Sequence, residues 1–218
     1  MTMRLELGTR VRLEEGAPRK LADIVIDAAS NRVTHLVVEP SDDPDAARLV
    51  PTALASQSAE GQGLSVRLTA AALDKLDRVH EHAFLQGGQQ PEKEPGWDVG
   101  IEDMEPIPQP TAVGPFPDYG GDPLGDVTVT YDRVPKGEIE LRHASDVYSS
   151  DEHHMGHVDG VLLDDGNTIT HLLLERGHLW RKREITIPAT AISKFETDMV
   201  TLGATKLEVE GFPSQKRE

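Results

Sequence analysis

The feature that most constrains this chain is a short stretch, Val33–Glu39, that returns later as Ile169–Glu175. The first copy reads VTHLVVE and the second reads ITHLLLE. Pro51 follows the first copy at almost the same spacing as Pro188 follows the second. A repeat that keeps its landmarks in step predicts two copies of one structural unit. Both side-chain parities of each copy are mainly apolar, which predicts a strand buried on both faces at the centre of a small barrel or sandwich.

Short strand-like segments separated by turn residues flank the first copy, a pattern typical of a small all-β unit. Pro40 ends the repeated strand because proline lacks the N–H that a ladder needs. Thr69 is a suitable N-cap for a short helix that carries Leu73 and Leu76. The strands expected in this copy are Leu5–Gly8, Val11–Leu13, Leu21–Asp27, Arg32–Glu39, Arg48–Pro51 and Leu64–Leu68.

The second copy shows a similar order of segments. Gly156 and Gly160 lie inside its longest expected strand and predict a bend or a bulge there. Asp165–Asn167 has the composition of a tight hairpin turn. The strands expected are Gly137–Arg142, Val147–Tyr148, Met155–Asp164, Ile169–Glu175, Arg183–Ile187, Ile192–Glu196 and Met199–Leu202, followed by a helical turn over Lys206–Val209.

Residues 87–125 differ in composition from both copies. Prolines, glycines and acids are frequent there, and Lys93 is the single basic residue of the segment, so it reads as an extended acidic linker. Trp97, Phe116 and Tyr119 either dock on a barrel or are isolated aromatics in a disordered tether. The predicted organisation is a first domain over 1–86, a linker over 87–125 and a second domain over 126–218.

The chain of 218 residues has a net charge of −16, no cysteine and 37% hydrophobic residues. The hydrophobic content is sufficient for a core in each of two domains. The negative field repels nucleic acid and anionic membranes, which favours a basic partner or none. The lack of cysteine excludes disulfides, thiolate metal sites and thiol chemistry. The N-terminal residues lack the pattern of a leader, and no apolar run approaches the roughly 20 residues of a membrane helix, so we expect a cytoplasmic protein.

The strand Leu21–Asp27, the Thr-His-Leu strand, and the proline after a short strand at Pro51 and Pro188 resemble tandem PRC-barrel domains. These small β-barrels are named for the cytoplasmic part of the photosynthetic reaction-centre H subunit, and one occurs in a ribosome maturation factor. The stretch His178–Pro188 is similar to bacterial, in particular actinobacterial, tandem proteins of this class. The chain departs from the reaction-centre subunit, which has a membrane helix, and from the maturation factor, which has a single PRC domain behind a different barrel.

The resemblance covers most of the chain outside the linker. It implies a mainly β protein with two small PRC-type β-barrels, each closed by a short C-terminal helix and related by internal duplication. It further implies a non-enzymatic interaction module of a kind that frequently self-associates or docks on a larger complex.

His35 and His171 lie within the two repeated apolar strands. One interpretation places the two imidazoles opposite each other across a pseudo-twofold interface. A core histidine that bonds to a backbone carbonyl is the commoner arrangement. We therefore assign a structural role to His35 and His171, and likewise to Pro51 and Pro188.

The densest group of potential metal ligands lies between residues 151 and 157, with His143 and His178 as further candidates. Its members are Asp151, Glu152, His153, His154 and His157. Their nitrogen and oxygen donors suit zinc or nickel. Their spacing matches no helical metal motif, however, and a specific site needs a rigid platform and orienting partners. We therefore expect an adventitious surface cluster, with no bound metal and no cofactor.

One short stretch concentrates positive charge in this acidic chain. Its members are Arg176, His178, Trp180, Arg181, Lys182 and Arg183. Arginine and tryptophan are enriched in binding hot spots, and an aromatic flanked by cations can also stack on a base. The alternative is a hairpin tip whose long side chains protect strand ends and whose tryptophan packs on its own barrel. As a binding surface, this stretch suits an acidic protein surface better than RNA.

The sequence contains no recognisable catalytic arrangement. Ser145, Ser149 and Ser150 have acids and histidines nearby but no nucleophile elbow, and the glycine pairs of the chain lack the features of a phosphate loop. We expect a non-enzymatic adaptor or scaffold that binds protein partners or self-associates, as an intrachain pseudo-dimer or a homodimer. The alternative is a ribosome- or RNA-associated accessory factor, by analogy with the maturation factor. A small hydrolase or metal-dependent enzyme is a residual third interpretation.

Overall fold

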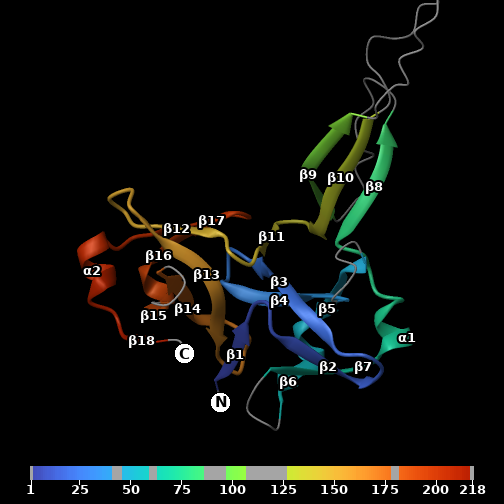
Figure 1. Cartoon of the computed structure of the whole chain (residues 1–218), viewed down its shortest axis with the longest axis horizontal. Coiled ribbons are helices and arrows are strands. Elements are labelled where there is room, and N and C mark those ends of the chain that lie inside the picture. The colour runs from blue at the N-terminus through green and yellow to red at the C-terminus, as the bar shows by residue number, and fades with distance from the viewer. Residues whose placement is uncertain are drawn as a thin grey trace, which may run out of the picture.

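The described part of the chain is mainly β, with its strands arranged in three sheets (Figure 1). A computed structural model describes residues 2–40, 46–58, 63–85, 97–106, 127–177 and 182–216. Within these ranges, every helix is too short and too polar to cross a bilayer. The mainly β character predicted from the alternating apolar pattern is confirmed.

The first large sheet is built around the first copy of the repeated strand. Its central members β3 and β4 pair antiparallel, whereas β2 and β7 pair parallel. The strand order is β5-β4-β3-β2-β7-β6. The strands are β2 (Arg10–Glu15), β3 (Arg19–Asp27), β4 (Arg32–Glu39), β5 (Arg48–Pro51), β6 (Ala55–Gln57) and β7 (Leu64–Thr69).

The second large sheet is built around the second copy and has a corresponding pattern of pairings. Its order is β16-β17-β12-β13-β14-β15-β18, with β12 and β17 parallel and β13 and β14 antiparallel. The strands are β12 (Asp146–Tyr148), β13 (His154–Leu163), β14 (Ile169–Arg176), β15 (Arg183–Pro188), β16 (Ile192–Phe195), β17 (Met199–Leu202) and β18 (Ser214–Lys216).

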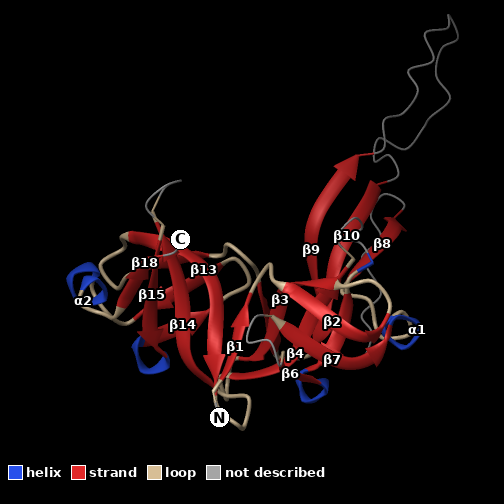
Figure 2. Ribbon diagram, turned by 60° about the horizontal axis from the view of Figure 1, so that its bottom comes forward, coloured by secondary structure: helices blue, strands red, loops and turns tan. Residues whose placement is uncertain are grey.

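The two large sheets exchange their leading strands. Strand β1 (Met3–Glu6) pairs with β13 of the second sheet, and β11 (Glu138–Leu141) pairs with β3 of the first. The hairpin turns also bond reciprocally, because Val33 N–H donates to the Asn167 carbonyl at 2.9 Å and Ile169 N–H donates to the Asn31 carbonyl at 2.8 Å. The two sheets consequently lie side by side as one interlocked body (Figure 2).

The larger of two apolar clusters runs through both sheets and includes the exchanged strands. Leu5 of β1 and Leu141 of β11 are fully buried in it, as are Leu36 and Leu172 of the two repeated strands. On the other face of β4, Val37 belongs to a second, smaller cluster. Burial on both faces is therefore confirmed for the second half of β4.

Short helices are present at both places where the sequence predicted helical turns, and their role in closing barrels stays a prediction. Helix α1 (Ala70–Leu73) is capped by the Thr69 hydroxyl, which accepts from Ala72 N–H at 3.3 Å. Helix α2 (Lys206–Glu210) begins with a capping box formed by Thr205 and Glu208. The first helix ends before Leu76, which lies in a turn, so the prediction that this residue is helical is wrong.

The third sheet stands off the body as a separate arm (Figures 1 and 2). It is antiparallel and has the order β8-β10-β9, formed by β8 (His80–Leu85), β9 (Trp97–Pro106) and β10 (Val127–Pro135). Strand β9 falls inside the segment 87–125 that was predicted to be a linker. Ten of those residues are thus a strand, because the prolines leave 97–105 uninterrupted and Pro106 stands only at its end, where a ladder donor is dispensable. The remainder of the predicted linker lies outside the described residues, and the domain boundaries stay a prediction.

Candidate metal centre

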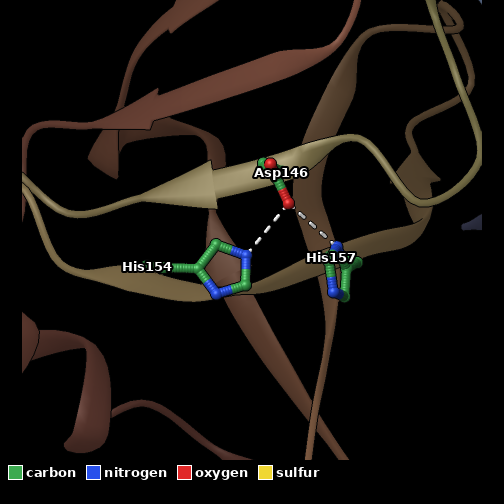
Figure 3. Close-up of side chains that lie close together, drawn as sticks. All are labelled: Asp146, His154 and His157. Carbon is green, nitrogen blue, oxygen red and sulfur yellow. Dashed lines mark hydrogen bonds and ion pairs between the residues drawn. The ribbon is translucent and has the colours of Figure 1, made fainter.

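Strands β12 and β13 bring three potential ligands together on one exposed face: Asp146, His154 and His157 (Figure 3). Asp146 Oδ1 lies 3.0 Å from His154 Nε2 and 3.1 Å from His157 Nδ1. All three donor atoms lie within 4.8 Å of one another. Two imidazoles and one carboxylate form a donor set that suits zinc, nickel or copper.

A β-bulge explains why two histidines three positions apart point to the same side. In a regular strand, residues 154 and 157 would face opposite sides of the sheet. Here Val147 is opposite Gly156 and Tyr148 is opposite His154, so Met155 is an extra residue in the ladder. Met155 and Gly156 are consecutive and both buried, and the exposed histidines flank them. The bulge predicted from the glycines thus places the His154 side chain on the same face of the sheet as His157.

Gly156 is required for this bulge. Its φ is +144°, a conformation that side chains rarely adopt, and a Cβ at this position would collide with the carbonyl oxygen of Glu175 on the neighbouring strand. The platform beneath the three ligands is therefore a strand pair whose local geometry allows only glycine at its turning point.

The three side chains are about half exposed: 43% for His154, 44% for Asp146 and 49% for His157. The imidazole rings of His154 and His157 meet edge to face with centroids 5.0 Å apart, and Tyr148 meets His154 in the same way at 5.4 Å. The ring contacts restrict how His154 can turn. The centre is thus accessible from solvent while its histidines are oriented by neighbours.

Several residues that the sequence grouped with His154 and His157 as potential ligands do not lie with them in the structure. His153 Nδ1 lies 3.3 Å from Asp151 Oδ2 and does not belong to the group. His143 lies beside Gly8, and His178 is outside the described residues. Asp146, which contributes the shared carboxylate, was not included in the predicted cluster. The sequence could have indicated Asp146 by its position just before the expected strand Val147–Tyr148. The turn after this strand lets it pair with the strand that carries the histidines.

His35 and His171 occupy corresponding positions in their strands. Each ring Nδ1 lies close to the hydroxyl of the preceding threonine, at 3.1 Å for Thr34 and 3.2 Å for Thr170. Each histidine also stands opposite the conspicuous proline in the ladder, His35 opposite Pro51 and His171 opposite Pro188. Both rings are half-buried, and the structural role of these four residues stays a prediction.

The predicted basic stretch is described only in part, because His178, Trp180 and Arg181 lie outside the described residues. Arg176 Nη1 lies 3.3 Å from Glu210 Oε1 of α2, and Lys182 Nζ lies 2.7 Å from Glu175 Oε1. Arg183 is exposed at the start of β15. Two of the three described cations are therefore balanced by acids of the same half.

The serines considered as nucleophiles have bonds that shape turns. The Ser145 hydroxyl donates to the backbone carbonyls of Arg142 and Thr197, both at 2.9 Å. The Ser149 hydroxyl accepts from the His153 N–H at 3.1 Å.

An open depression of about 480 Å³ lies beside α2, with Thr190, Ala204, Glu208 and Phe212 among its lining residues. None of the predicted site residues with a described position lines this depression.

We compared the sequence with models of known protein families and with curated proteins. No family model matches the chain, and no curated protein matches it. The resemblance to tandem PRC-barrel proteins therefore stays a prediction from the sequence motifs.

Proposed function

We propose that the protein is a non-enzymatic adaptor that binds protein partners, built from two duplicated PRC-type β-barrels. The proposal is supported by the corresponding pairings of the two large sheets, in which one parallel pair adjoins a run of antiparallel strands. It is also supported by the exchanged strands β1 and β11, which join the halves into one body and suit a rigid scaffold.

The observation that carries the adaptor role is the long outer strand of the arm. β9 covers ten residues and pairs only with β10 among the described strands. An edge strand presents a row of backbone donors and acceptors to which an extended segment of another chain can add. We therefore assign the outer edge of β9 as a site for strand addition by a partner.

The charge of β9 indicates the chemistry of that partner. The segment Trp97–Pro106 contains Asp98, Glu102, Asp103 and Glu105 and no basic residue. The whole chain carries a net charge of −16. A partner segment rich in lysine or arginine gains favourable electrostatics along the whole strand, whereas an acidic segment is repelled. The proposed partner is thus a protein with an extended basic segment.

The alternative role, an accessory factor that binds ribosomes or RNA, has less support. It depends on free positive charge around Trp180, and Arg176 and Lys182 are ion-paired with Glu210 and Glu175. Acidic β9 also disfavours phosphate. The basic stretch retains a place in the adaptor proposal as a second surface for an acidic partner.

The test is to identify partners by crosslinking in the native host and to reconstitute each complex from purified components. We expect Asp98→Lys/Glu105→Lys to weaken binding at least tenfold, a loss of about 1.4 kcal/mol. The matched control is Glu14→Lys/Glu15→Lys, which changes the net charge equally at exposed residues of β2 and should leave the affinity within about twofold.

Equal affinity of the β9 variant and the wild type would contradict strand addition at β9. Loss of binding only in Trp180→Ala would move the interface to the basic stretch. Ribosome co-sedimentation that falls with salt and disappears on charge reversal of Arg181 and Lys182 would replace the adaptor role with the alternative.

A further inference from the structure

We propose that Asp146, His154 and His157 bind one divalent transition-metal ion of the zinc class. The inference is independent of the adaptor role, because the site lies on the second large sheet and involves no residue of the arm. It reverses the expectation of an adventitious cluster, which included His154 and His157 but not Asp146.

The spacing of the donor atoms fits a tetrahedral ion. With zinc bonds of about 2.0–2.1 Å, ligand atoms in a tetrahedral site lie about 3.3 Å apart. Asp146 Oδ1 lies 3.0 Å from His154 Nε2 and 3.1 Å from His157 Nδ1. The two nitrogens lie within 4.8 Å of each other, and rotation of the exposed His157 imidazole can bring them closer. The two carboxylate–imidazole distances therefore lie close to the value expected around a tetrahedral ion.

The ligands stand on a rigid part of the fold. β12 lies between β13 and β17, and Asp146 N–H donates to the Asp198 carbonyl at 2.9 Å. Asp146 stands directly opposite His157, while the bulge at Gly156 brings His154 to the same face. The rigid platform that the spacing of the histidines did not reveal is the pairing of β12 with β13.

The corresponding place in the first sheet shows that the fold does not require these residues. Val147 precedes the bulge and pairs with Val200 in the parallel ladder, as Val11 pairs with Leu64 in the first sheet. The residue before Val11 is Arg10, and it stands opposite Lys20, as Asp146 stands opposite His157. Two cations occupy the positions where the second sheet has a carboxylate and an imidazole. Of these two corresponding positions, only the pair in the second sheet carries side chains that can bind a metal ion.

Three protein ligands leave one tetrahedral position for water or for a donor from another molecule. Two imidazoles among the three donors favour zinc, nickel or copper over magnesium and calcium, which prefer oxygen ligands. The proposed ligand is therefore a divalent transition-metal ion of intermediate hardness, such as zinc, bound at a solvent-accessible site.

The test uses the full chain without a histidine tag, titrated with zinc by calorimetry and by competition with a chromophoric chelator. We expect one zinc ion per chain, and we expect His154→Ala, His157→Ala and Asp146→Ala each to weaken binding at least tenfold. His153→Ala is the matched control, because this neighbouring histidine is exposed but lies outside the group, and it should change the affinity less than about twofold. Far-ultraviolet circular dichroism of each variant confirms that the fold is retained.

Nitrogen-15 spectra of the imidazoles provide a second measurement that does not depend on variants. Zinc should shift the Nε2 signal of His154 and the Nδ1 signal of His157 and leave His153 unchanged, and magnesium should shift none of them. Zinc binding weaker than about 1 mM, equal loss in the His153 control, or equal binding of magnesium would each overturn the proposal.

Discussion

At the residue scale, Asp23 links the two halves through a partly buried carboxylate. Its Oδ1 accepts from the N–H of His143, which follows β11 in sequence, at 2.5 Å. Burial raises the pKa of Asp23 above its ordinary value, although the hydrogen bond from His143 opposes this change. Burial of the ionised form therefore costs stability near neutral pH.

The sign of the resulting pH dependence follows from the raised pKa of Asp23. The folded state holds the proton to higher pH than the unfolded state, so the free energy of unfolding rises as the pH falls through the raised pKa toward about 3.9. Asp23→Asn keeps an acceptor for His143 and removes this dependence. We expect the variant to be at least as stable as the wild type at neutral pH, with the difference shrinking in acid, by urea unfolding at several pH values. A variant less stable at every pH would contradict the assignment.

Gly156 is the second residue at which a local prediction can be made. Gly156→Ala forces an L side chain into a positive φ and against the Glu175 carbonyl, and we expect a loss of about 1–3 kcal/mol in the free energy of unfolding. Gly137→Ala is the control, because Gly137 has a φ of +84° but no atom within 4 Å of the added Cβ. It should lose less than Gly156→Ala, and equal losses would show that backbone strain alone explains the effect.

At the element scale, the exchanged strand β1 is anchored by a charge pair. Arg4 Nη2 lies 2.6 Å from Glu184 Oε2 on β15, and Glu184 is only 7% exposed. Arg4 also contacts Glu6 on its own strand. The pair joins the N-terminal strand to a sheet that comes from the other end of the chain.

Removing one partner of this pair leaves a buried carboxylate without its cation. We expect Arg4→Ala to lower the free energy of unfolding by about 1–3 kcal/mol. Arg4→Ala/Glu184→Gln should recover part of the loss, because the neutral amide is less costly to bury. Denaturant unfolding of the two variants and of Glu184→Gln alone measures this coupling, and additive losses would show that the pair contributes nothing specific.

At the scale of the whole molecule, the exchanged strands and the shared core predict that the halves remain associated after the chain is cut. A specific protease site inserted between Gly114 and Pro115 permits a single cleavage. We expect the two fragments to elute together from a sizing column, because β1 and β11 each add to the other half's sheet and β10 pairs with β8 and β9 of the first fragment. Cleaved protein in denaturant is the control for complete separation. Separate elution in native buffer would refute the interlocked arrangement.

The sequence by itself determined where most strands lie. β4 and β5 begin and end where the pattern predicted, because apolar periodicity and turn residues such as Pro40 act locally. The bulge near Gly156 was likewise visible in the sequence, since glycine marks a conformation that other residues avoid. Strands β6, β8, β9, β10 and β18 were not predicted. The sequence missed β9 because the neighbouring prolines dominated the composition of its segment.

Only the tertiary structure decided which strands pair. The exchange of β1 and β11 and the meeting of Asp146 with His154 and His157 depend on ladder partners distant in sequence or on a register shift of one residue. Local propensity carries no information on such partners, because a strand has the same pattern whichever edge it joins. The free energy of burying Leu5 and Leu141 in one shared core favours the exchanged arrangement, and this burial exists only in the folded chain.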